Sequence, residues 1–190
     1  MTWPTPRLAP PQPADYNARQ QQIAAAIASG PRGIVAGPLA IWLHRPQLAD
    51  TAQALGAYCR YGTSLEPRLS ELAILVTGRV FGSEYEWFAH KDHALAAGLP
   101  PETVEAIRLN RVPAFETEEE IVVHDVARAA HLNRGLDDTL YARAMAVLGQ
   151  DRLVDLVGLL GYYTLISLTI NIFGVTPPDS ATQELGRGMT

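Results

Sequence analysis

The chain has 190 residues, of which 47% are hydrophobic and 18% charged, so it can form one domain with a sizeable core. It carries 15 Lys and Arg against 20 Asp and Glu, a net charge of −5 with no basic run, which argues against nucleic acid or an anionic membrane as partner. A single cysteine, Cys59, excludes an internal disulfide and favours a reducing cytoplasm.

Helix signals recur along the chain and strand signals are nearly absent, so we expect an all-α fold of about eight helices. A proline-rich arm without the apolar core of a signal peptide fills residues 1–14, one domain spans 15–176, and a polar, loose tail spans 177–190. The expected helices are 15–29, 46–61, 67–81, 83–97, 101–109, 117–131, 137–148 and 151–173. Several begin at a capping residue: Asp15, Thr117 with Glu120, Asp137 or Asp138, and Asp151.

The uncharged segment 156–170 tests whether the chain enters a membrane. It is shorter than the roughly 20 apolar residues that span a bilayer, and Gly158 and Gly161 interrupt it. We therefore expect a buried core helix or a helix at a subunit interface, and no membrane partner.

Most residues that could carry chemistry lie in 71–98, two helices with a break at Gly82. Glu86 and His90 are one helical turn apart, and His93 follows on the same side. An acid beside an imidazole can exchange a proton with it and bring its pKa within reach of neutrality. Glu71 is a lone acid on an apolar helix, and near Glu86 it would repel that carboxylate, so that one of the two would keep its proton.

Structural interpretations of the same residues stay open. Ser83 with Glu86 three residues later is also a capping-box pattern, which would only satisfy backbone donors. Glu86, His90 and His93 share a face that could bind a metal, although no fourth ligand is evident. Cys59 lies among small residues in a helix, which is typical of a packing cysteine.

The stretch resembles the carboxymuconolactone decarboxylase family, which shares the AhpD-like helical fold of the alkylhydroperoxidase D proteins. The residues that carry the resemblance are Pro67 to Leu75, Gly82 to Trp87, His90 and Ala97 to Leu99, with flanking similarity at Gly37-Pro38, Leu43 to Pro46 and Leu160 to Thr164. It covers about residues 15–176. The resemblance implies a homo-oligomer, a trimer or hexamer, with sites near the subunit contacts.

The peroxidase branch of the family has a Glu, a Cys-x-x-Cys pair and a His, a pattern that falls here on Glu71, Ser83, Glu86 and His90. Both thiols are replaced, and a serine hydroxyl cannot take their redox role. The acid and the imidazole remain, and the decarboxylase branch, which acts in aromatic degradation, is implied to use proton transfer. There a small lactone bearing carboxylates loses carbon dioxide and the enolate is protonated.

Our first hypothesis is therefore a cofactor-free lyase that decarboxylates or processes a small organic acid or lactone. His90 would move the proton, Glu86 would orient the His90 ring, and Glu71 would be the second acid or base. Ser83 would offer a hydroxyl or its backbone N–H to an anion. The candidate substrate-binding residues are Arg68, which would pair with Glu71 or a substrate carboxylate, and His44, His93 and Tyr163.

Two rival hypotheses remain. A peroxidase could use Cys59 or a metal. A non-enzymatic oligomeric ligand-binding protein would show Glu71, Glu86 and His90 too far apart to share a pocket, or Ser83 and Glu86 occupied in capping with no cavity nearby.

Overall fold

The computed structural model describes residue 3 and residues 5–186, and these residues form helices and connecting loops without a strand. The elements are η1 (Pro13–Asp15), α1 (Ala18–Ser29), α2 (Pro38–Trp42), α3 (Pro46–Tyr61), α4 (Pro67–Phe81), α5 (Glu84–Ala96), α6 (Pro101–Arg108), α7 (Glu118–Leu132) and α8 (Asp138–Phe173). The predicted all-α class is thereby confirmed.

Helix α4 is the innermost element. Every residue from Leu69 to Gly78 is buried, because α5, α7 and α8 all pack against this helix. Its apolar residues join the central hydrophobic cluster with those of the neighbouring helices. Gly82, at φ 60°, ends α4 in the left-handed conformation that glycine adopts without strain, and the chain then turns into α5. An acid placed on α4 is therefore held inside the protein and faces α5.

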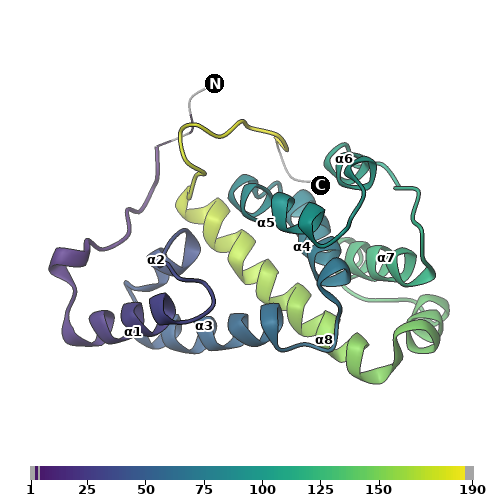
Figure 1. The fold of residues 1–190 in the computed structure, drawn as a ribbon, viewed down its shortest axis with the longest axis horizontal. Helices are drawn as coiled ribbons and strands as arrows, with labels where there is room; N and C mark the ends of the chain where they lie inside the picture. Colours follow the sequence, from purple (N-terminus) through teal and green to yellow (C-terminus); the bar gives the residue numbers. More distant parts are fainter. Residues whose placement is uncertain (1–2, 4, 187–190) are drawn as a thin grey trace.

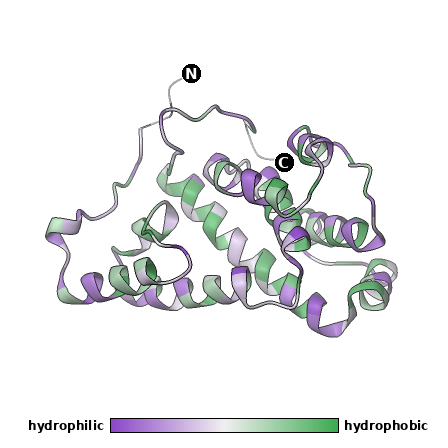
Figure 2. Cartoon of the chain, in the orientation of Figure 1, coloured by the Kyte–Doolittle hydropathy of each residue, from purple (hydrophilic) through white to green (hydrophobic). Residues whose placement is uncertain are grey.

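Helix α8 runs between two groups of helices, α1–α3 on one side and α4–α7 on the other (Figure 1). Gly149, at φ 75°, interrupts it where the sequence predicts the boundary between two helices. Its length and composition alone would suit a membrane span, but 61% of its most apolar window is buried inside the protein. Figure 2 shows that this helix consists largely of hydrophobic residues and passes through the middle of the fold, which is typical of a core helix.

Two of the predicted helix starts differ from the structure. Asp15 lies in η1, and α1 is capped instead by Asn17, whose side chain accepts a bond from the backbone N–H of Gln20. Asp151 lies inside α8, just after its break. The Thr117–Glu120 capping box and the Asp137 cap form as predicted.

The two terminal segments cross the same end of the molecule (Figure 1). In the arm, the backbone N–H of Arg7 donates to the carbonyl of Phe173 at the end of α8. The predicted looseness of the tail is wrong for its described part, because the backbone N–H groups of residues 184–186 all donate to the Glu84 carboxylate and Leu185 is buried. Residues 1, 2, 4 and 187–190 of these two segments lie outside the described residues.

Candidate active site

The imidazole of His90 is the centre of a buried polar cluster supplied by three helices. Helix α4 contributes Glu71, α5 contributes Glu86 one turn before His90, and α8 contributes Tyr163. All four side chains are at least nine-tenths shielded from solvent. The packing of α4 against α5 and α8 thus brings together residues that are far apart in the sequence.

Each ring nitrogen of His90 faces a carboxylate. Nδ1 lies 2.7 Å from Oε2 of Glu71, a short hydrogen bond, and Nε2 lies 3.1 Å from Oε1 of Glu86. The second contact has the distance of an ion pair without the direction of a hydrogen bond, and no described residue bonds that Glu86 oxygen. The hydroxyl of Tyr163 lies 3.4 Å from the same Nε2. Glu71 therefore fixes the ring, while the Nε2 side keeps capacity for another partner.

These contacts determine the charge of the ring. Burial alone would lower the pKa of His90, but the charge of Glu86 and the hydrogen bond and charge of Glu71 outweigh it and raise the pKa to about 9. The imidazole is then protonated at neutral pH and separates the two carboxylates.

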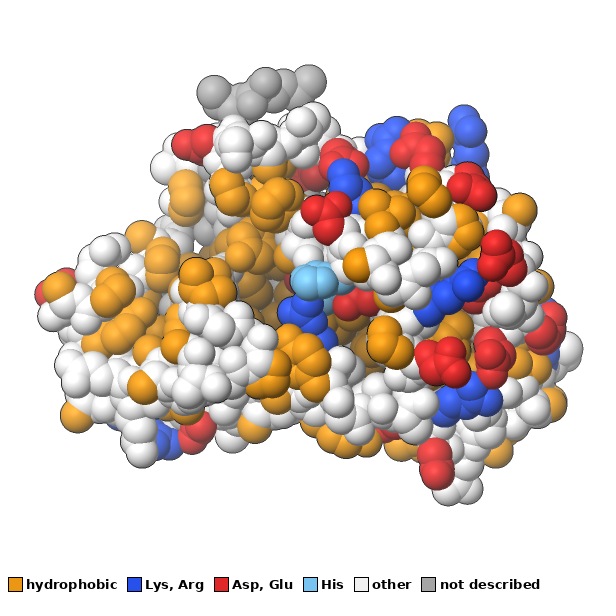
Figure 3. Space-filling view, viewed as in Figure 1, with side chains coloured by type: hydrophobic (Ala, Val, Ile, Leu, Met, Phe, Trp, Pro, Cys, Tyr) orange, Lys and Arg blue, Asp and Glu red, His pale blue; other side chains and the backbone are white. Residues whose placement is uncertain are grey.

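The Nε2 side of His90 opens into a cavity of about 330 Å³ between α5 and the α1–α3 group. Figure 3 shows the surface hollowed there, with hydrophobic side chains on its walls and a histidine beside a basic side chain at its mouth. The 30–37 loop, α2, α3, α5 and α8 all contribute lining residues, among them Arg32, Leu39, Arg60, Tyr85, Glu86, His90, His93, Tyr162, Tyr163 and Ile166. The cavity could hold a small organic molecule against the buried cluster.

His93 and Tyr163 both line this cavity, as a substrate-binding role requires. The ring of His93 lies 5.9 Å from that of His90. Burial first, and then the charge of Glu86, raise the pKa of Tyr163 well above its usual value, so its hydroxyl stays protonated and can donate a hydrogen bond.

The three other predicted site residues lie outside the cavity lining: Arg68, His44 and Ser83. The predicted partner of Arg68 is wrong, because its guanidinium pairs with Glu120 at 2.6 Å and Glu116 at 2.9 Å, and it does not line the cavity. His44 is exposed outside the cavity, and its Nε2 lies 2.8 Å from the carbonyl oxygen of Ala9 in the N-terminal arm.

Ser83 has neither of its predicted roles. It does not form the capping box, since its side chain makes no cap bond and Glu86 is turned toward His90. Its backbone N–H is already bonded to the carbonyl of Gly78 at 2.8 Å, so it cannot hold an anion. Its hydroxyl is fully buried, without a hydrogen-bond partner among the described residues, and outside the cavity lining.

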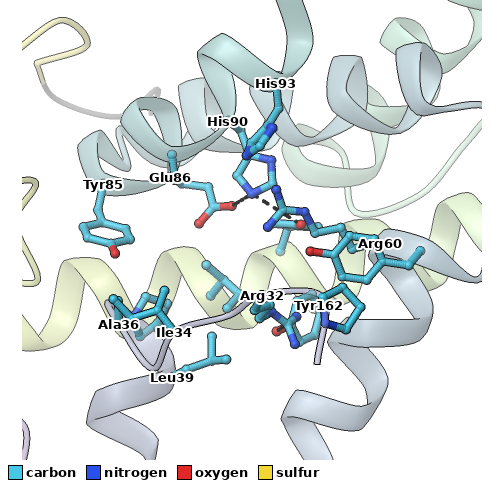
Figure 4. A pocket seen from close by; sticks show the side chains of 16 residues that line it. Arg32, Ile34, Ala36, Leu39, Arg60, Tyr85, Glu86, His90, His93 and Tyr162 are labelled. Atoms are coloured by element: carbon cyan, nitrogen blue, oxygen red, sulfur yellow. Dashed lines mark hydrogen bonds and ion pairs between the residues drawn. The ribbon is translucent and has the colours of Figure 1, made fainter. Parts of the chain in front are cut away.

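The sequence reasoning missed the wall opposite α5. Figure 4 shows Arg32 and Tyr162 across the cavity from Glu86 and His90, with Arg60 extending from the end of α3. Neither arginine belongs to a recognisable motif. A weak signal was the glycine- and proline-punctuated segment 30–38, which forms this wall around Arg32.

The structure also gives the surroundings of the residues on which the peroxidase and non-enzymatic hypotheses depend. Cys59 is buried in α3 outside the cavity lining, and burial raises the pKa of its thiol. Among the described residues, no three His, Cys, Asp or Glu side chains are grouped to hold a metal ion. Neither structural condition for a degenerate site is met, because Glu71, Glu86 and His90 are in contact and Glu86 and His90 line a cavity.

Comparison with known proteins gives a family match and a set of similar folds. Residues 46–129 match the carboxymuconolactone decarboxylase family, a segment that contains Glu71, Glu86 and His90. No curated protein sequence matches the chain.

Several solved structures share the fold over nearly the whole chain. A peroxidase-related protein from Ralstonia eutropha JMP134 with an alkylhydroperoxidase AhpD core has a TM-score of 0.74 at 14% identity, covering 93% of this chain and 94% of that one. A peroxidase-related protein from Silicibacter sp. TM1040 has a TM-score of 0.72 at 12% identity, covering 96% and 95%. The debrominase Bmp8 in complex with 2,3,4-tribromopyrrole has a TM-score of 0.71 at 13% identity, covering 93% of both chains. At these identities the similarity establishes the AhpD-like fold alone.

Proposed function

Because residues 46–129 belong to the carboxymuconolactone decarboxylase family, set in an AhpD-like fold, we propose that this protein is an acid–base enzyme acting on a small organic acid or lactone. The observation that carries the proposal is the protonated imidazole of His90, fixed by Glu71 and open to a cavity on its other side. A buried histidine that lines a cavity and has a raised pKa is a suitable proton donor.

The reaction we propose is decarboxylation. A carboxylate borne on the carbon next to an electron-accepting carbonyl leaves as carbon dioxide, and the electron pair of the broken C–C bond forms an enolate with that carbonyl. His90 then donates its Nε2 proton to the carbon of that enolate, and Glu71 stabilises the imidazolium before this transfer through Nδ1. Tyr163, whose hydroxyl lies near the same Nε2, can donate a hydrogen bond to the enolate oxygen. The neutral imidazole that is left after this transfer would be the base that removes a proton from a lactone.

The test is a panel of carboxylated lactones and small keto acids, each assayed for release of carbon dioxide and for ring opening. His90→Gln should lower kcat/KM by about 10²–10⁴-fold, the contribution usual for a positioned proton donor. His44→Gln is the matched control, since that histidine is exposed outside the cavity, and it should keep the wild-type rate. Unchanged activity in His90→Gln would sink the mechanism.

A thiol peroxidase is the second candidate, and the placement of Cys59 disfavours it. Peroxide reduction needs an accessible thiolate, whereas this thiol is buried and its pKa is raised. Peroxide turnover that disappears in Cys59→Ala would establish this candidate instead.

We also propose that the protein acts in the cytoplasm, because a lone buried cysteine needs no oxidising compartment.

A further inference from the structure

Arg32 is a half-buried cation that faces the cavity without a carboxylate partner. Its guanidinium donates to the backbone carbonyl of Gln53 at 3.2 Å and to the hydroxyl of Tyr162 at 3.3 Å. Within the described part of the chain, no Asp or Glu lies within ion-pair distance of it. Other half-buried arginines do pair with carboxylates: Arg68, Arg108, Arg143 and Arg152. The usual intramolecular counter-ion is thus missing where Arg32 faces the cavity.

Gly56 makes room for this arrangement. A Cβ atom at position 56 of α3 would lie 2.1 Å from the hydroxyl oxygen of Tyr162 and 2.6 Å from Nη2 of Arg32. Any larger residue would push both groups away. Burial also raises the pKa of Tyr162 to about 12, so its hydroxyl stays neutral and orients the guanidinium without neutralising it.

The charges around the cavity are not balanced. Arg60 is a second half-buried arginine in the lining, and its contact among the described residues is with the ring of Tyr61. Arg32, Arg60 and protonated His90 carry three positive charges against the two carboxylates of Glu71 and Glu86. One positive charge therefore remains for a bound molecule to neutralise.

We propose that Arg32, positioned by Gly56 and Tyr162, binds the carboxylate of an organic anion in this cavity. A guanidinium with unused N–H groups matches the geometry of a carboxylate. The body of the ligand then lies against the lining residues Leu39, Tyr85 and Ile166, in the cavity that His90 also lines. The inference rests on the proposed function only for the nature of the reaction at His90, since binding of the anion needs no turnover.

The test uses benzoate and its neutral isostere benzamide as probes, with dissociation constants measured by titration calorimetry near neutral pH. The wild type should bind benzoate at least about tenfold more tightly than benzamide, because charge-assisted hydrogen bonds are the stronger ones. Arg32→Gln should weaken benzoate binding by about 10- to 100-fold and leave benzamide binding nearly unchanged. Arg45→Gln, an exposed arginine outside the cavity, should behave as the wild type.

Gly56→Ala separates positioning from charge. It keeps Arg32 but displaces its guanidinium, so benzoate binding should weaken while benzamide binding changes less. Thermal unfolding of each variant shows that it is folded before it is titrated. Equal binding of the two probes by the wild type, no binding of benzoate, or full benzoate affinity in Arg32→Gln would each overturn the inference. Benzoate binding that depends on Arg32 in a protein with no His90-dependent turnover would uphold the inference and reject the proposed function.

Discussion

The buried imidazole of His90 makes the stability of the fold depend on pH. Its pKa is raised from 6.5 in the unfolded chain to about 9 in the fold, so the folded state binds the proton more tightly. The resulting stabilisation is complete below about pH 6.5 and is lost as the pH rises through about 9. A shift of this size corresponds to a contribution on the order of 3 kcal/mol.

Urea unfolding at several pH values between about 6 and 10 measures this contribution. The wild type should lose stability over that range, and Glu71→Gln should lose less, because the neutral amide supports the imidazolium less well. His90→Gln should lack this part of the pH dependence altogether. Parallel curves for the wild type and His90→Gln would show that the ring does not titrate as proposed.

Local spacing explains which site residues the sequence predicts. Glu86 and His90 are neighbours on one helix, so their contact follows from helical geometry. The capping box at Ser83 fails because the Glu86 side chain has a stronger partner in His90 than in the helix end. Arg32 could not be predicted, because its place depends on the packing of the 30–37 loop against Gly56 and α8.

The C-terminal segment 184–186 is hydrogen-bonded to the first turn of α5, the helix that carries Glu86 and His90. The Glu84 carboxylate, in the first turn of α5, accepts the backbone N–H groups of Glu184, Leu185 and Gly186 at 2.8–3.0 Å. The Glu184 carboxylate in turn accepts the indole N–H of Trp87 at 3.2 Å. Composition alone predicts a loose polar tail. That prediction fails because the bonds that hold the tail join its backbone N–H groups to a carboxylate about 100 residues away, and such bonds leave no local sequence signal.

Glu84→Gln should therefore lower the free energy of unfolding by about 1–2 kcal/mol, because the amide accepts with one oxygen where the carboxylate accepts with two. Glu102→Gln is the matched control, an exposed acid in the first turn of α6. Chemical denaturation gives the stability, and hydrogen exchange should show faster exchange at residues 184–186 in Glu84→Gln alone. Equal losses in the two variants would indicate a helix-dipole effect, with no contribution from the hydrogen bonds between residues 184–186 and Glu84.

The whole molecule presents an apolar stripe to solvent along α8. We define the α8 stripe as Val154, Val157, Gly161, Leu168 and Ile172, which are all exposed and recur at helical spacing. Val154 and Val157 are 65% and 59% exposed, and both also line an apolar groove with Tyr141, Met145 and Leu153. One face of α8 packs against α3, α4 and α7, as expected of a core helix. The opposite face carries the exposed α8 stripe, where the expected subunit interface could form.

An exposed apolar stripe of this kind is costly in water, and a second copy of the chain would cover it. We therefore predict self-association through the α8 stripe, and light scattering should give a mass of several chains, for which a trimer or hexamer remains the expectation. Val157→Glu places a charge at the centre of the stripe and should shift the mass toward one chain, because a buried unpaired carboxylate opposes association. Val112→Glu is the control, since Val112 is 78% exposed in the α6–α7 loop, away from the stripe. A wild-type mass of one chain, or a Val157→Glu mass equal to that of the wild type, would contradict an interface on α8.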